Sequence, residues 1–289
     1  MTPSVSPAGQ GGYSDVEYVF EPHTATMPDL REYLESLLDR RQFMVALAKA
    51  DLRGLRSRTA LGGVWGVLDP LFQATIYFFL YVILRGNSGG DRSAFLPILI
   101  GDIFLFGLTT AAMGEAGTSI KRAKGLMLSS TFPRALLPIT SVYKSLRQFG
   151  LAAAVFAVIF PLVGGTPGPG LFVLPLLFVV HVTMNVGIAL LVSSFVILVP
   201  DGTNVMTYVS RILFFATPII YPVTLLPDTA RLLVGWQPLF ALFASYQAVF
   251  RGDVPSLGLV VTSAVWAIAL LVVGAQVFLR HERQFALHL

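Results

Sequence analysis

Six apolar segments, each long enough to cross the hydrocarbon core of a bilayer as a helix, follow one another along the chain. They cover residues 64–84, 94–113, 139–163, 171–199, 205–221 and 255–279. Short polar stretches rich in Gly, Pro, Asp or Arg separate most of them, as expected of loops that end helices. The pattern predicts an all-α, six-span integral membrane domain over residues 63–280.

A different pattern precedes the first apolar segment. In residues 29–62 leucines recur at helical spacing between arginines and lysines, which predicts a pair of amphipathic helices on the inner membrane surface. A small soluble helical domain is the alternative, although it offers few residues for a core. Residues 1–28 are rich in Gly, Ser and Pro without apolar periodicity, so we expect a disordered N-terminal extension.

Charge sets the predicted orientation. Fifteen of the 20 lysines and arginines fall before the first span, between Lys121 and Arg147, or at Arg280 and Arg283, beside and within the tail 281–289. The positive-inside rule places these regions, and both termini, in the cytoplasm. The apolar stretch 232–250 would reverse the last span if it crossed, so 222–251 is interpreted as re-entrant or interfacial helices on the outer side.

The loop 115–138 between the second and third spans is too polar for a bilayer and carries four basic residues against the single acid Glu115. Its segment TSIKRAKGLML has the spacing of a short helix of about three turns lying across a surface. Pro133 and Pro138 stiffen the chain that follows. We interpret this loop as a cytoplasmic coupling element.

Composition narrows the function classes. With 55% hydrophobic and 12% charged residues and a mean hydropathy of +0.73, the chain has the composition of a multi-span membrane protein. The absence of cysteine excludes disulfides and thiol nucleophiles. Because the basic residues lie in loops beside apolar spans, the net charge of +4 points to anionic lipid headgroups rather than nucleic acid.

Motifs for chemistry are missing from the sequence. It contains no G-x-x-x-x-G-K-[ST] loop for nucleotide phosphates and no paired histidines at metal-ligand spacing. We therefore expect no catalytic residues, no metal and no cofactor on this chain. The isolated His181 is interpreted as a packing residue bonded to a neighbouring helix rather than as a ligand.

Two charged residues in predicted spans are singled out, because a charge at mid-bilayer depth costs about 2.5–3.5 kcal/mol on insertion scales. Asp102 is close to the middle of the second span and Arg211 lies about two turns into the fifth. The hypothesis is that both face the interior, as a structural ion pair or as part of a polar pathway. Arg211 could also reach a polar cavity from the inner side.

Aromatic side chains concentrate in the first, second and fifth spans. Their rings can stack on the apolar faces of sugars, so they are candidates for lining a substrate path. The alternative is contact with lipid or membership of the interfacial aromatic belt. The candidates are Trp65, Tyr77, Phe78, Tyr81, Phe104, Tyr208 and Phe215.

Three segments together resemble a known family. Residues 41–71, RQFMVALAKADLRGLRSRTALGGVWGVLDPL, are similar to its amphipathic helix and the Gly, Trp and Pro-Leu positions after it, and 130–138, STFPRALLP, to the prolines that follow its coupling helix. Gln237-Pro238-Leu239 stands where the family has Asn-Pro-Leu. The chain resembles the permease subunit of ABC-2 type polysaccharide exporters of the O-antigen, teichoic acid or galactan branch. Pro200-Asp201 departs from the family's Arg-Asp, and the Ala, Val, Gly and Pro content favours an actinobacterial galactan exporter.

The resemblance implies a homodimer in the bacterial inner membrane, joined to two copies of a separate ATPase subunit that binds ATP and Mg. A lipid-linked polysaccharide would pass between the two permeases, with the first and fifth spans as channel lining. The implied ATPase-contacting residues are Thr118, Lys121, Arg122, Lys124, Met127 and Leu128. A drug or lipid efflux permease of the same family is the alternative.

Two other classes fit the sequence less well. A secondary transporter would need acidic relay residues within spans and usually two related halves, whereas Asp102 is the one acid close to the middle of a predicted span and no repeat is visible. A membrane-embedded transferase would need a general base beside an acceptor site, and the sequence shows no such cluster.

Overall fold

The computed structural model describes residues 30–56, 64–85, 92–129, 132–221, 227, 229, 235–282 and 284–287, and all its elements there are helical. The predicted disordered extension 1–28 lies outside these residues. The elements are α1 (Leu30–Asp39), α2 (Arg41–Arg56), α3 (Trp65–Arg85), α4 (Arg92–Arg122), α5 (Lys124–Ser129), α6 (Leu136–Leu162), η2 (Pro169–Val173), α7 (Leu174–Leu198), α8 (Gly202–Ala216), α10 (Pro238–Phe250), α11 (Leu257–His281) and η4 (Gln284–Leu287).

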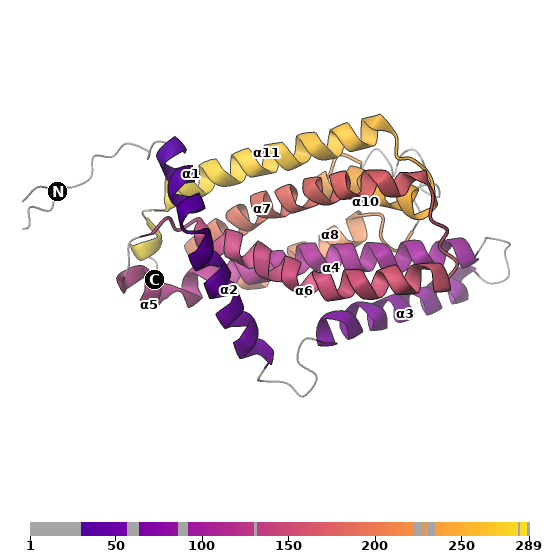
Figure 1. Cartoon of the computed structure of the whole chain (residues 1–289), viewed down its shortest axis with the longest axis horizontal. Coiled ribbons are helices and arrows are strands. Elements are labelled where there is room, and N and C mark those ends of the chain that lie inside the picture. Colours follow the sequence, from indigo (N-terminus) through magenta and orange to yellow (C-terminus); the bar gives the residue numbers. More distant parts are fainter. Residues whose placement is uncertain are drawn as a thin grey trace, which may run out of the picture.

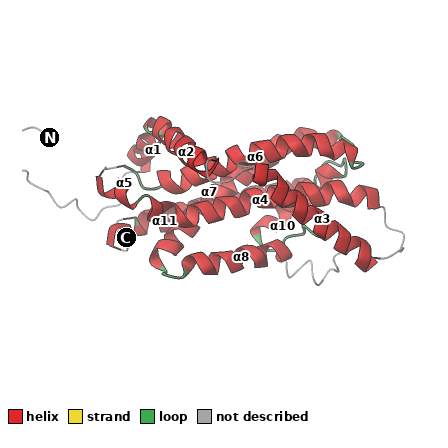
Figure 2. Cartoon of the chain, turned by 90° about the horizontal axis from the view of Figure 1, so that it is seen from below, coloured by secondary structure: helices red, strands yellow, loops and turns green. Residues whose placement is uncertain are grey.

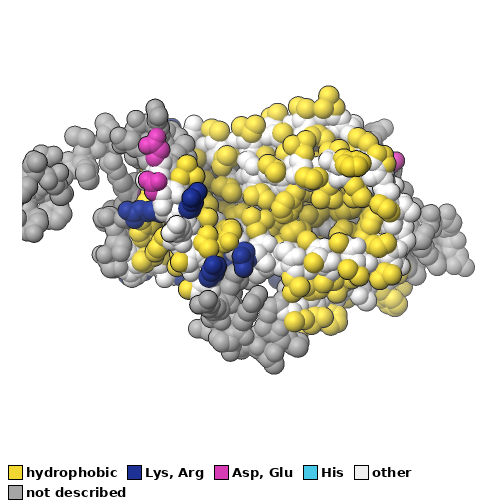
Figure 3. Space-filling model, viewed as in Figure 1, with side chains coloured by type: hydrophobic (Ala, Val, Ile, Leu, Met, Phe, Trp, Pro, Cys, Tyr) yellow, Lys and Arg dark blue, Asp and Glu magenta, His cyan; other side chains and the backbone are white. Residues whose placement is uncertain are grey.

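Long helices form the body of the molecule and run along its longest axis (Figures 1 and 2). Four of them in the described residues are long and apolar enough to cross a bilayer: α4, α6, α7 together with η2, and α11. Large apolar side chains such as Leu162, Val265 and Ile268 stay more than half exposed. An exposed apolar surface of this kind matches a hydrocarbon solvent, and it covers most of the face shown in Figure 3.

The six-span count stays a prediction. Of the other two predicted spans, α3 has 21 residues, whereas α8 has 15 and would extend only about 22 Å. The 13-residue α10 would extend about 20 Å, short of a hydrocarbon core of about 30 Å. All of α10 beyond its first residue is buried, and most of the remaining predicted re-entrant segment lies outside the described residues.

Helix α7 packs along α11 through two glycines. A Cβ on Gly187 of α7 would collide with the backbone of Leu270 and Leu271 on α11, and one on Gly274 would collide with the Gly187 carbonyl oxygen. Small residues let transmembrane backbones approach closely, which strengthens van der Waals packing where lipid supplies no hydrophobic drive. This crossing fixes α11 against the centre of the molecule.

Helices α1 and α2 lie across one end of the long helices, where α5 and η4 also lie (Figures 1 and 2). The first and last described elements therefore share one end, as an even number of crossings requires. Most charged side chains visible in Figure 3 gather near this end, whereas the rest of that face is mainly hydrophobic. A small cluster with Ile120, Leu137, Phe278 and Phe285 at its centre joins the elements there.

Candidate functional site

The predicted coupling helix is divided in the structure. Helix α4 does not end near Met113 but continues to Arg122, and the six-residue α5 starts after a turn at Ala123. The expectation of one separate helix over TSIKRAKGLML is therefore wrong. The reason is packing: the buried Ile120 and the half-buried Met127 both contact the cluster at this end, one from each side of the turn.

The six residues implied to contact an ATPase differ in exposure. Lys121, Arg122 and Lys124 are exposed, whereas Thr118 and Met127 are half-buried and the side chain of Leu128 lies outside the described part. The Thr118 hydroxyl lies 3.4 Å from two carbonyl oxygens of its own helix. The surface presented at the turn between α4 and α5 is thus mainly basic.

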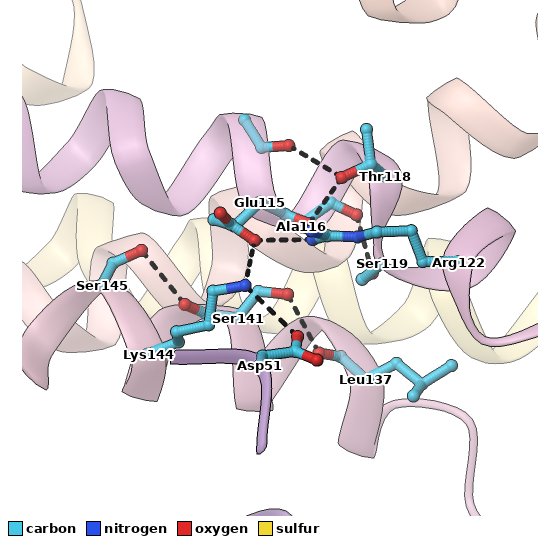
Figure 4. Close-up of polar contacts among 11 residues, drawn as sticks. Asp51, Glu115, Ala116, Thr118, Ser119, Arg122, Leu137, Ser141, Lys144 and Ser145 are labelled. Carbon is cyan, nitrogen blue, oxygen red and sulfur yellow. Dashed lines mark hydrogen bonds and ion pairs between the residues drawn. The ribbon is translucent and has the colours of Figure 1, made fainter. Parts of the chain in front are cut away.

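A buried lysine joins three helices beside this surface (Figure 4). Lys144 of α6 is 2% exposed, and its Nζ lies 2.6 Å from Glu115 Oε2 of α4 and 3.2 Å from Asp51 Oδ2 of α2. Glu115 Oε2 also accepts a hydrogen bond of 2.5 Å from Arg122 Nη2. A buried cation requires such partners, because leaving it unpaired would cost several kcal/mol.

A second polar network ties the two ends of the described chain together. The Tyr33 hydroxyl of α1 donates to the Glu282 carboxylate at 3.0 Å, and the same carboxylate accepts from the Arg134 amide at 2.8 Å. The Arg134 guanidinium in turn donates to the Glu282 carbonyl oxygen. Burial and the neighbouring carboxylate raise the pKa of Tyr33, so this hydroxyl stays protonated and remains a donor.

Together the two networks connect helices from both ends of the described chain. The Lys144 network bonds α2, α4 and α6, and the Glu282 network bonds α1, the start of α6 and the end of α11. The α4 end that leads into α5 is thus bonded to both α2 and α6 through Lys144. Sequence reasoning missed this role of Lys144, which it counted only as one of the inner basic residues.

A cavity of about 700 Å³ lies between α3, α4, α6 and α8. We call it the mixed cavity, because polar and aromatic side chains line it together. Its charged and amide groups come from Asp69, Gln73, Gln148 and Arg211. Carboxylate, amide and guanidinium groups offer several donors and acceptors to a hydroxyl-rich ligand, so the cavity can bind polar solutes inside an otherwise apolar body.

The structure separates the seven aromatic candidates. Tyr77, Phe104 and Phe215 line the mixed cavity, and Tyr77 packs on Phe214 with ring centroids 5.2 Å apart. Trp65 and Tyr208 are exposed and lie outside its lining. The remaining two candidates are Phe78, which packs on the main core, and Tyr81, whose side chain lies outside the described residues.

Asp102 and Arg211 do not meet. Asp102 is fully buried and accepts a 3.0 Å hydrogen bond from Gln247 of α10, whereas Arg211 is exposed, lines the mixed cavity and lies over the Tyr208 ring. Of the possibilities raised by the sequence, the structure supports a polar cavity for Arg211 and a buried position for Asp102. An ion pair between them is not formed.

The interpretation of His181 is confirmed. It is fully buried in α7, with Nε2 2.8 Å from Thr109 Oγ1 of α4 and Nδ1 3.4 Å from the Tyr246 hydroxyl of α10. Both ring nitrogens thus have partners on neighbouring helices, which is the packing role of an intramembrane polar residue. In the described part of the chain no three His, Asp or Glu side chains group as metal ligands.

Comparison with known proteins identifies the protein family to which the chain belongs. Three relatives carry the description "O-antigen export system permease protein RfbA". The one from Myxococcus xanthus is 22% identical over 256 residues, 88% of this chain and 97% of the relative. One from Klebsiella pneumoniae is 22% identical over 244 residues, 84% and 93% of the two chains, and another from that species is 20% identical over the same length. Residues 41–251 match the family model described as ABC-2 type transporter, and since this is most of the chain, the protein belongs to the ABC-2 type transporter family.

Proposed function

We propose that this chain is the membrane permease subunit of an ABC exporter that moves a lipid-linked polysaccharide across the bacterial inner membrane. The observation that carries the proposal is the mixed cavity, whose carboxylate, amide, guanidinium and aromatic groups suit a sugar chain. The similarity to O-antigen export permeases over more than four-fifths of this chain supports it. The polymer would be of the O-antigen, teichoic acid or galactan type.

The energy would come from two copies of a separate ATPase subunit that binds ATP and Mg, since the sequence has no nucleotide-binding loop of its own. The exposed basic side chains at the turn between α4 and α5 would contact that subunit. Closure of the ATPase pair would then move this end of α4, and the Lys144 network would carry the motion to α2 and α6.

A homodimer would complete the path. Arg211 and Tyr208 are exposed on α8, although α8 belongs to the membrane domain. Because an arginine facing lipid costs about 2.5–3.5 kcal/mol on insertion scales, its side chain should face a polar path or a second copy instead. The substrate would pass between the two copies, along α3 and α8.

The basic end of the bundle would face the cytoplasm, together with both termini. On this topology α1 and α2 lie on the inner membrane surface, where their lysines and arginines meet anionic headgroups. The short outer turn between α6 and α7 and the predicted re-entrant segment would lie on the other side.

The proposal is tested by depletion in the source organism. We expect surface glycan to fall and lipid-linked glycan to accumulate inside the cell, and an intact copy should restore both. Normal surface glycan after complete depletion would refute export of a polysaccharide. Accumulation of a drug or a phospholipid instead of a glycan would assign the protein to the efflux branch of the family.

A further inference from the structure

A second cavity, of about 520 Å³, lies among α4, α6, η2, α7 and α10. We call it the apolar cavity, because Tyr246 is the only residue in its lining with a polar side-chain atom. The lining residues are Phe104, Leu105, Phe149, Ala153, Phe156, Ala157, Phe160, Pro161, Pro167, Leu171, Leu174, Phe178, Tyr246 and Phe250. The Tyr246 hydroxyl lies 3.4 Å from His181 Nδ1, so the cavity offers one partly used hydroxyl and no charged group to a polar ligand.

The two cavities share a wall. Phe104 of α4 and Phe149 of α6 line both of them. On the apolar side Phe149 stacks on Phe178 with centroids 5.8 Å apart, and Phe104 lies 6.0 Å from Phe156. Two rings thus separate a space suited to hydroxyl groups from a space suited to hydrocarbon. In Figure 3 the hydrophobic face of the molecule is hollowed in its middle.

Adjacent polar and apolar spaces match the two halves of an amphiphile. We propose that the apolar cavity holds the hydrocarbon chain of the lipid that carries the glycan, while sugars nearest that lipid occupy the mixed cavity. This inference rests on the proposed function and adds where the two parts of the substrate bind.

The carrier lipid is preferred over bulk phospholipid because its hydrocarbon chain is covalently attached to the glycan. Bilayer chains are as apolar as the side chains of the cavity, so moving any hydrocarbon chain from the bilayer into it gains no hydrophobic energy. A chain whose attached sugars are held in the mixed cavity is different, because the first contact raises the effective concentration of the chain at the second. Occupancy by the carrier lipid should therefore depend on the glycan.

Photo-crosslinking in glycan-producing cells tests the proposal. A benzophenone side chain replaces Ala157, which lines the apolar cavity, and in a matched control replaces Ala154, which is exposed on the same helix outside the lining. We expect glycan-bearing lipid to be captured at position 157 about tenfold more than at 154, the ratio expected for a modest effective-concentration advantage. Blocking glycan synthesis should abolish that difference.

Two results would overturn the proposal: capture of phospholipid alone at position 157, or equal capture of the carrier lipid at both positions. Filling the cavity is the second arm. Ala153→Trp should lower export about tenfold, as expected for overpacking of a filled site, whereas Ala154→Trp should not. Equal export by the two variants contradicts the proposal.

Both arms use cells in which wild-type export has first been measured, and folding of each variant is checked by its retention in the membrane and its elution in detergent. If depletion leaves surface glycan unchanged, the export function itself fails. If export is normal but position 157 never captures the carrier lipid, the placement of the hydrocarbon chain fails alone.

Discussion

The crossing of α7 on α11 and the walls of the mixed cavity differ sharply in how tightly their residues are packed. At the crossing, Gly187 and Gly274 leave no room for a single added carbon, and the contacts are backbone to backbone. Around the cavity, side chains of α3 and α8 such as Gln73, Arg211 and Phe215 stay exposed and can move without breaking a core. Helices α4, α7 and α11 thus form a tightly packed fixed frame, whereas packing constrains the cavity-facing side chains of α3 and α8 much less.

The largest expected effect comes from the fixed frame. Gly187→Leu should destabilise the protein by about 3 kcal/mol or more, because the side chain meets the α11 backbone and α11 must move away. Gly150→Leu on α6 is the matched control, since its Cβ would point into open space. Unfolding in mixed detergent micelles measures both. Equal stability of the two variants would mean that the crossing is not tightly packed.

Removing the buried cation should have the next largest effect. Lys144→Met leaves Glu115 and Asp51 without their shared partner, and we expect a loss of about 2 kcal/mol. This is below the range of about 3–5 kcal/mol for a fully buried pair, because Glu115 remains 21% exposed. Lys121→Met, at an exposed lysine outside the network, is the control and should change stability little.

A double variant sharpens the second prediction. Glu115→Gln in the Lys144→Met background removes the negative charge that has lost its buried cation, leaves an amide oxygen to accept from Arg122, and should recover part of the lost stability. Transport per ATP hydrolysed, measured in vesicles that contain both subunits, should be low in both the single and the double variant, since both lack the bond between α4 and α6. Full recovery of that ratio would mean that the network only stabilises the fold.

The interhelical hydrogen bond to His181 should contribute less. Thr109→Val removes its 2.8 Å bond between α4 and α7, and the expected loss is about 1 kcal/mol, near the upper part of values measured inside membranes. Thr183→Val is the control, because the Thr183 hydroxyl bonds only a carbonyl oxygen of its own helix. A loss of the same size in both variants would argue against a specific role of the α4–α7 bond.

The smallest effect on stability is expected at the cavity. Arg211→Gln should change the free energy of unfolding by less than about 0.5 kcal/mol, because the side chain is exposed and lies over the equally exposed Tyr208 ring. Export of glycan should nevertheless fall if Arg211 borders the path. Unchanged export together with unchanged stability would remove Arg211 from the path and shift attention to Gln73 and Gln148.

Several features could be read from the sequence because they depend on local patterns. Hydrophobic length marked the helices that became α4, α6, α7 and α11, and the isolated His181 could be assigned to packing. The family was also accessible, since its signals are short segments such as residues 41–71. The length of an apolar segment and the prolines and glycines that end a helix are properties of residues close together in the sequence. They can therefore be recognised without the tertiary structure.

Tertiary structure decided the rest, because contacts between distant residues leave no periodic signal. No spacing could reveal that Lys144 reaches Glu115 and Asp51, that Asp102 pairs with Gln247 rather than Arg211, or that α4 continues past the predicted loop. The cavities also exist only through packing: Phe104 and Phe149 are far apart in the chain and form a common wall only when α4 and α6 lie side by side. The sequence thus determined which segments partition out of water into the membrane or the protein interior. Packing among the helices determined which of their side chains come into contact.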